Sequence, residues 1–174
     1  VENLTRDSFW NVYTPGCTEH YVLNQFRTNP DFIPELSLVL ELDGKIIGHV
    51  MYCWSKINVD DGSQIKMMTF GPISIHPDFK RKGYGKILLD YSMEKAKQMG
   101  AGCLLICGNS DFYGKSGFVV ASSKGIRYAD DPKSDASYFL CKELEEGFLN
   151  GISGSYKDHE GYFVAMKNPE AFAE

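Results

Sequence analysis

The chain has 174 residues, of which 43% are hydrophobic and 24% charged, and its formal net charge at pH 7 is −5. This length suits one domain with a real hydrophobic core. The negative charge argues against a nucleic-acid binder, which usually carries a basic surface. No apolar stretch approaches the roughly 20 residues that span a bilayer, so we expect no membrane partner.

The cysteines and histidines show no spacing that predicts disulfides or a metal site. The five cysteines are an odd number without a C-x-x-C pair, and two of them lie in an apolar run at 103–107. Buried free thiols in a reducing cytoplasm are therefore expected. No Cys or carboxylate stands at ligand spacing from the four scattered histidines, so we expect no metal.

The first elements in chain order are helical and are followed by a hairpin. Apolar residues recur at helical spacing over 1–13, and a second helical stretch covers 19–27 after the Pro15-Gly16 break. Leucines then alternate over 36–42, Asp43-Gly44 supplies a tight turn, and 46–54 is apolar again. Alternation on both sides of such a turn predicts a β-hairpin.

A third strand is predicted over 64–77. Its interior Gly71-Pro72 predicts a bend or splay, because proline cannot donate to a strand ladder. A helix is expected over 83–99, with Gly100 as its stop, followed by a strand at 103–107 that is buried on both faces. Asn109 or Ser110 is expected to cap a short helix, and further strands are predicted at 117–122 and 137–144. This order predicts an α/β domain with a mixed sheet.

The segment KRKGYGK, residues 80–86, combines positive charge and two glycines at the start of the predicted long helix. Backbone N–H groups and a helix N-terminus favour a phosphate group there. The P-loop pattern fails, because Ile87 follows Gly85-Lys86 and the earlier glycine is absent. The dinucleotide pattern is weak, because Leu88 replaces the third glycine. From the loop alone, the alternative interpretation, a solvent-exposed basic turn that binds no ligand, remains open.

The residues around this loop resemble motif A of the GNAT acetyltransferase superfamily, in which two apolar positions and a proline precede a basic-x-x-Gly-x-Gly loop. The positions that match are Ile73, Ile75, Pro77, Gly83 and Gly85. Lys80 stands where the family usually has Gln or Arg. Downstream, Tyr113 precedes Gly117-Phe118 as in the family's next motif, and GNSDFYGKSGF resembles the bacterial YhbS-like branch of predicted acetyltransferases.

The resemblance covers about Leu36 to Tyr156 and implies the fold. We expect a GNAT domain over 1–174 whose mixed, mostly antiparallel twisted sheet has splayed central parallel strands and flanking helices. Because members begin with a strand before the first helix, that strand is expected to be missing here.

The resemblance also implies acetyl-CoA as co-substrate and a primary amine as acceptor, with direct attack in a ternary complex. The protein is expected to be a monomer or homodimer. Tyr113 would protonate the leaving thiolate, since a phenol of pKa about 10 stays protonated at neutral pH. The expected cofactor contacts are Ile73, Ser74, Ile75, Lys80, Arg81, Lys82, Gly83, Tyr84, Gly85, Lys86, Asn109 and Tyr113.

The general base stays open among Glu41, His49, His76 and a water chain. Alternation along the strand points His49 into the expected cleft, and an imidazole titrates near neutral pH. A histidine in an apolar strand is, however, more often a core residue. Two other functions also stay open. One is a regulatory module that binds acyl-CoA without turnover, and the other is a transferase of longer acyl groups.

Overall fold

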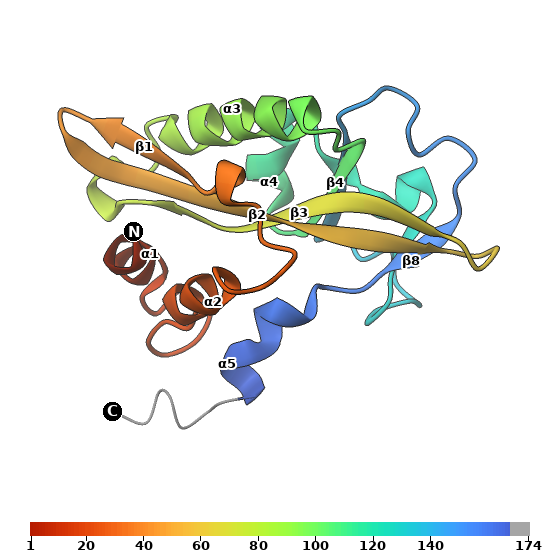
Figure 1. Ribbon diagram of the computed structural model, residues 1–174, viewed down its shortest axis with the longest axis horizontal. Helices are drawn as coiled ribbons and strands as arrows, with labels where there is room; N and C mark the ends of the chain where they lie inside the picture. Colours follow the sequence, from red (N-terminus) through yellow and green to blue (C-terminus); the bar gives the residue numbers. More distant parts are fainter. Residues whose placement is uncertain (168–174) are drawn as a thin grey trace. The chain divides into compact units, whose positions relative to one another are not determined.

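The computed structural model describes residues 1–167, in which two helices precede the first strands and α3 follows β3 (Figure 1). The helices are α1 (Glu2–Phe9), α2 (Glu19–Phe26), α3 (Tyr84–Gln98), α4 (Ser110–Tyr113) and α5 (Val164–Lys167), with short 3-10 turns η1 (Pro34–Leu36), η2 (Pro77–Phe79), η3 (Gly114–Ser116), η4 (Ala121–Lys124) and η5 (Glu160–Phe163). The strands are β1 (Leu38–Leu42), β2 (Lys45–Val59), β3 (Gln64–Ile75), β4 (Cys103–Cys107), β5 (Val119–Val120), β6 (Ile126–Tyr128), β7 (Phe139–Glu143) and β8 (Gly154–Tyr156).

The chain forms two compact units. The first contains Val1–Tyr52, Gly71–Leu88 and the described residues from Asp158 onward, and the second contains Cys53–Phe70 and Leu89–Lys157. Strand β3 passes from one unit to the other between Phe70 and Gly71, where the sequence predicts a bend. The predicted domain of 1–174 also includes residues 168–174, which lie outside the described residues.

In the first unit, β1 and β2 form the predicted hairpin. Asp43 and Gly44 both have positive φ, 49° and 75°, as a two-residue type I′ turn requires, and Leu42 pairs with Lys45. Residues 47–53 of β2 are all buried. Helices α1 and α2 of the same unit lie side by side (Figure 1). The turn chemistry and the alternation of apolar residues therefore predicted this part of the fold correctly.

The sheet combines parallel and antiparallel pairs, which confirms the predicted mixed sheet. Its strands pair in the order β5-β7-β4-β3-β2-β8-β6, and β1 pairs with β2. Strand β4 runs parallel to β3, with Met68 opposite Leu104, and antiparallel to β7. Strand β6 runs parallel to β8. The prediction missed β6 and β8 and made β5 too long, because strands this short carry too few residues to show alternation.

The core of the second unit explains the chemistry of its cysteines. Cys103 and Cys141 are fully buried, and burial raises the pKa of the Cys103 thiol to about 12 and that of Cys141 to about 11. All five cysteines are free thiols, and Cys107 is the exposed one. The other four thiols are buried, which makes them poorly accessible to reagents.

Replacing Gly154 by alanine should destabilise the protein by about 2 kcal/mol, because overpacking at a rigid site costs about 1–3 kcal/mol. A Cβ there would lie 2.6 Å from the carbonyl oxygen of Asn58 and 3.2 Å from the Cα of Val59, and backbone cannot move aside like a side-chain end. Urea unfolding measures the effect. Gly114→Ala is the matched control, since its Cβ meets nothing within 4 Å and its φ is −58°. An equal loss in both variants would contradict the steric explanation.

Candidate functional site

The predicted site residues divide between the two units. The end of β3, the basic loop at 80–86 and His49 belong to the first unit, and Asn109 and Tyr113 belong to the second.

The basic loop has the backbone conformation that presents N–H groups. Arg81 and Gly83 have positive φ, 62° and 89°, and helix α3 begins at Tyr84. The N–H of Ile87 donates to the Gly83 carbonyl at 3.2 Å, which makes Gly83 the residue at which the helical ladder starts. The N–H groups in the first turn of a helix point out of its N-terminal end. This arrangement can hold an anion.

Aromatic rings pack against one another next to the basic loop. Phe79 packs edge-on against His76 at 5.7 Å and against Tyr84 at 6.0 Å between ring centroids. The Lys82 ammonium lies 5.4 Å from the Phe79 centroid. Arg81, Lys82 and Lys86 are exposed. The loop therefore carries its positive charge at the surface, next to packed aromatic rings.

The end of β3 makes polar contacts with helix α1. The Ser74 hydroxyl is 1% exposed and donates to the Thr5 hydroxyl at 3.1 Å. The Ile75 carbonyl accepts a hydrogen bond from the Ser8 hydroxyl at 2.9 Å. Ile73 is partly exposed. Among the three predicted contacts on this strand, the side chain of Ser74 and the carbonyl of Ile75 thus have partners inside the protein.

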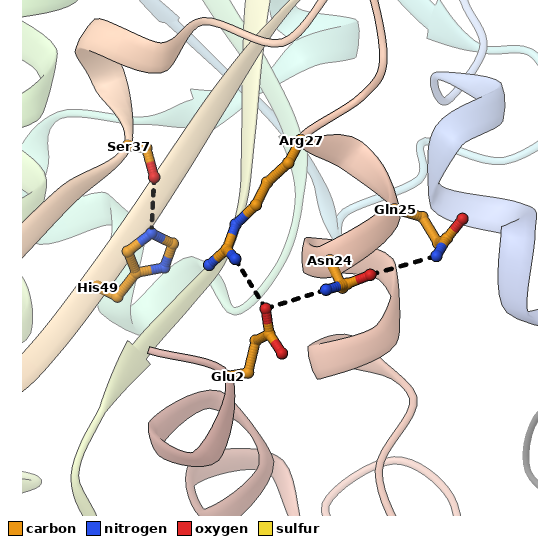
Figure 2. Close-up of polar contacts among 6 residues, drawn as sticks. All are labelled: Glu2, Asn24, Gln25, Arg27, Ser37 and His49. Carbon is orange, nitrogen blue, oxygen red and sulfur yellow. Dashed lines mark hydrogen bonds and ion pairs between the residues drawn. The ribbon is translucent and has the colours of Figure 1, made fainter.

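His49 is 1% exposed, and Figure 2 shows its ring beside Ser37. Its Nε2 lies 3.0 Å from the Ser37 Oγ, and its Nδ1 has no hydrogen-bond partner among the described residues. Burial lowers the pKa of His49 to about 4, with smaller contributions from the positive charges of the Val1 amino group and Arg27. Arg27 itself pairs with Glu2 at 2.8 Å. The imidazole is therefore neutral at neutral pH.

The other two candidates for the base differ from His49. Glu41 is exposed on β1, the strand whose one pairing partner in the described chain is β2. His76 accepts a hydrogen bond at its Nδ1 from the Asp78 N–H, 3.3 Å away, so its side chain caps the turn η2. Glu41 lies on β1, His49 on β2, and His76 between β3 and η2.

In the second unit, Tyr113 lies at the end of helix α4. Asn109 caps this helix as predicted, because its Oδ1 accepts from the Asp111 N–H at 2.7 Å. The Tyr113 ring packs edge-on against Phe70 and Phe118, with centroids 5.9 and 5.5 Å away. A Cβ at Gly108 would lie 2.3 Å from this ring, so the glycine makes room for it. The ring is partly buried.

The sequence did not predict the part that Thr5 and Ser8 of α1 play beside β3. Both are buried, yet serine and threonine on a short helix are usually read as surface residues. Their spacing of three positions, on the same helix face as the buried Leu4, is the signal that could have found them.

Residues 1–167 contain neither a candidate metal cluster nor a membrane-spanning helix. No group of three or more His, Cys, Asp or Glu side chains lies close enough there to hold a metal ion. No helix in this part of the chain is both long and apolar enough to cross a membrane.

Residues 4–118 match the model of the acetyltransferase (GNAT) family, and the chain therefore belongs to this family. The match includes β3, the basic loop, α3 and the Tyr113 segment. The resemblance inferred from motif A and from the tyrosine motif is thereby confirmed.

Particular relatives are similar over different parts of the chain. The uncharacterized N-acetyltransferase YjhQ of Escherichia coli K12 is 27% identical over 93 residues, 53% of this chain and 51% of that protein. The aligned region thus spans about half the length of this curated relative. The E. coli YhbS structure in complex with CoA has a TM-score of 0.76 at 22% identity, covering 92% of this chain and 83% of that one. A Brucella melitensis GNAT acetyltransferase in complex with acetyl-CoA has a TM-score of 0.68 at 21% identity, covering 93% and 89%. At these identities the two structures establish the shared fold.

Proposed function

We propose that this chain is an N-acetyltransferase that moves the acetyl group of acetyl-CoA to a primary amine by direct attack in a ternary complex. The observation that carries the proposal is the basic loop. Arg81 and Gly83 have positive φ angles just before the N-terminus of α3, within the residues that match the family model. The solved relatives bound to CoA and acetyl-CoA support the choice of donor.

In this proposal, backbone N–H groups of 83–86 hold the pyrophosphate, and Arg81, Lys82 and Lys86 supply positive charge. The acceptor nitrogen attacks the thioester carbon and forms the C–N bond. The C–S bond then breaks, and the Tyr113 hydroxyl gives its proton to the departing thiolate. The proton on the acceptor nitrogen goes to solvent.

We do not assign the role of base to His49. Its ring is 1% exposed, and a pKa of about 4 makes its conjugate acid too strong to hold a proton taken from an alkylammonium. Water that reaches the amine can accept this proton, and a water chain is one of the candidates for the base that the sequence left open.

Thermal unfolding with acetyl-CoA, CoA, ATP or NAD tests the donor. A ligand at 100 times its dissociation constant should add about 2.7 kcal/mol to stability, and we expect this shift with the two CoA compounds alone. Gly83→Ala should lose it, because a Cβ at φ 89° distorts the loop. Gly100→Ala is matched, since its φ is 91° and its Cβ also meets nothing within 4 Å, but it lies after α3 and should keep the shift.

A larger shift with ATP or NAD than with CoA would overturn the proposal. A CoA shift together with no turnover on a broad panel of primary amines would favour the acyl-CoA-binding module instead. Competition by longer acyl-CoA compounds separates acetyl transfer from the transfer of longer groups.

A further inference from the structure

Helix α1 is joined to the end of β3 by buried polar contacts. The hydroxyls of Ser74 and Thr5 are 3.1 Å apart, and both residues are at most 1% exposed. Ser8 is 4% exposed, and its hydroxyl lies 2.9 Å from the Ile75 carbonyl and 2.7 Å from the Leu4 carbonyl. Buried hydroxyls with satisfied partners fix the position of the elements that carry them. Helix α1 is therefore held in register with β3.

The same helix also binds the start of the basic loop. The Lys80 Nζ donates to the carbonyl of Ser8 at 2.6 Å, across 72 positions of sequence. Ser8 belongs to the last turn of α1, where carbonyl groups have no partner within the helix and the dipole favours a cation. Lys80 is an exposed residue, and its ammonium caps the end of α1.

Ser8 is the residue that links these contacts. Its hydroxyl donates to the carbonyl of Ile75, the last residue of β3. Its carbonyl accepts a hydrogen bond from the ammonium of Lys80, the first residue of the loop. Between Ile75 and Lys80 the chain makes only the short turn η2. Immediately after Lys80, Arg81 takes a φ of 62°, so the conformation that presents the N–H groups starts where the chain is fixed.

We propose that Lys80 is a positioning residue, which sets the phosphate loop against α1 through the Ser8 carbonyl, and that Lys80 is not itself a ligand of the pyrophosphate. The inference rests on the proposed function. A single ammonium suits a single backbone acceptor, whereas the Gln or Arg usual at this position carries a planar group. Arg81, Lys82 and Lys86, which are exposed as Lys80 is, would supply the positive charge for the ligand.

The test compares Lys80→Met, which keeps most of the aliphatic chain, with Lys82→Met in the full chain. For Lys80→Met we expect faster amide hydrogen exchange at the end of α1 and over 80–86 without ligand. The Kd for CoA should rise about tenfold, the effect of one lost charge-assisted hydrogen bond. The dependence of this Kd on salt should stay unchanged. Lys82→Met should raise the Kd and weaken its salt dependence, without faster exchange in the free protein, because it removes a direct charge contact.

Two results would overturn the inference. Weaker salt dependence in Lys80→Met with unaltered exchange would make Lys80 a direct phosphate ligand. Faster exchange with an unchanged Kd for CoA, measured well below the melting temperature, would make the contact one of stability alone. Lys80→Arg should restore part of the affinity, because a guanidinium can also donate to the Ser8 carbonyl. Failure of the unsubstituted chain to bind CoA would instead reject the proposed function, and it is seen before any variant is made.

Discussion

Replacing Tyr113 by phenylalanine should lower kcat by about 100-fold or more, because general acid catalysis contributes about 10²–10⁴-fold. Phenylalanine keeps the ring that packs on Phe70 and Phe118, so the fold and the Kd for CoA should change little. The measurement is steady-state kinetics with the best amine found in an acceptor screen, alongside CoA titration.

Tyr91→Phe is the matched control for Tyr113→Phe. Tyr91 is 57% exposed on α3 and has no part in the proposed chemistry. The kcat of the Tyr91→Phe variant should therefore stay within twofold of that of the unsubstituted protein. If Tyr113→Phe also stayed within twofold, Tyr113 would not be the acid, and another group would protonate the thiolate.

The second large effect is a loss of stability in acid that arises from His49. The pKa of this buried imidazole is about 4, against 6.5 for an ordinary histidine. Between these two pH values the unfolded chain binds more protons than the folded protein, so the free energy of unfolding falls as the pH is lowered. The stabilisation is fully present above about pH 6.5 and is lost towards pH 4, and it amounts to about 3 kcal/mol.

Urea unfolding from pH 7.5 to 4 measures this loss, and His49→Gln isolates it. The Gln side chain can still hydrogen-bond the Ser37 hydroxyl, which lies 3.0 Å from Nε2 in the original protein, but it does not titrate. The variant should lack the part of the pH dependence between 6.5 and 4. Carboxylates affect both proteins alike, so identical pH profiles would contradict the role of His49.

The elements that were predicted correctly are those determined by neighbouring residues in the sequence. The hairpin follows from Asp43-Gly44, and Asn109 caps α4 through its own side chain two residues along the chain. Helix α3 and the buried strand β4 have clear periods and clear ends. Strands β6 and β8 could not be predicted in this way, because each has three residues and is defined by pairing with strands distant in sequence.

The candidate site shows the same division. Its glycines and its tyrosine are visible as a motif, since their spacing is fixed along the chain. The contact of Lys80 with Ser8 depends on the fold, and the charge of Lys80 alone suggested a phosphate ligand. Alternation suggested that His49 points into the cleft, but its burial, which lowers its pKa, depends on elements distant in sequence.

The burial of the cysteines gives the protein a low background toward thiol-specific reagents. Acetyl transfer releases one CoA thiol per turnover under the proposed function, and a disulfide dye reports that thiol directly. Cys17, Cys53, Cys103 and Cys141 are buried, so the folded chain should react rapidly at Cys107 alone. The dye should therefore titrate about one thiol per native chain and all five after denaturation. The same count, followed over time, also reports how often the core opens.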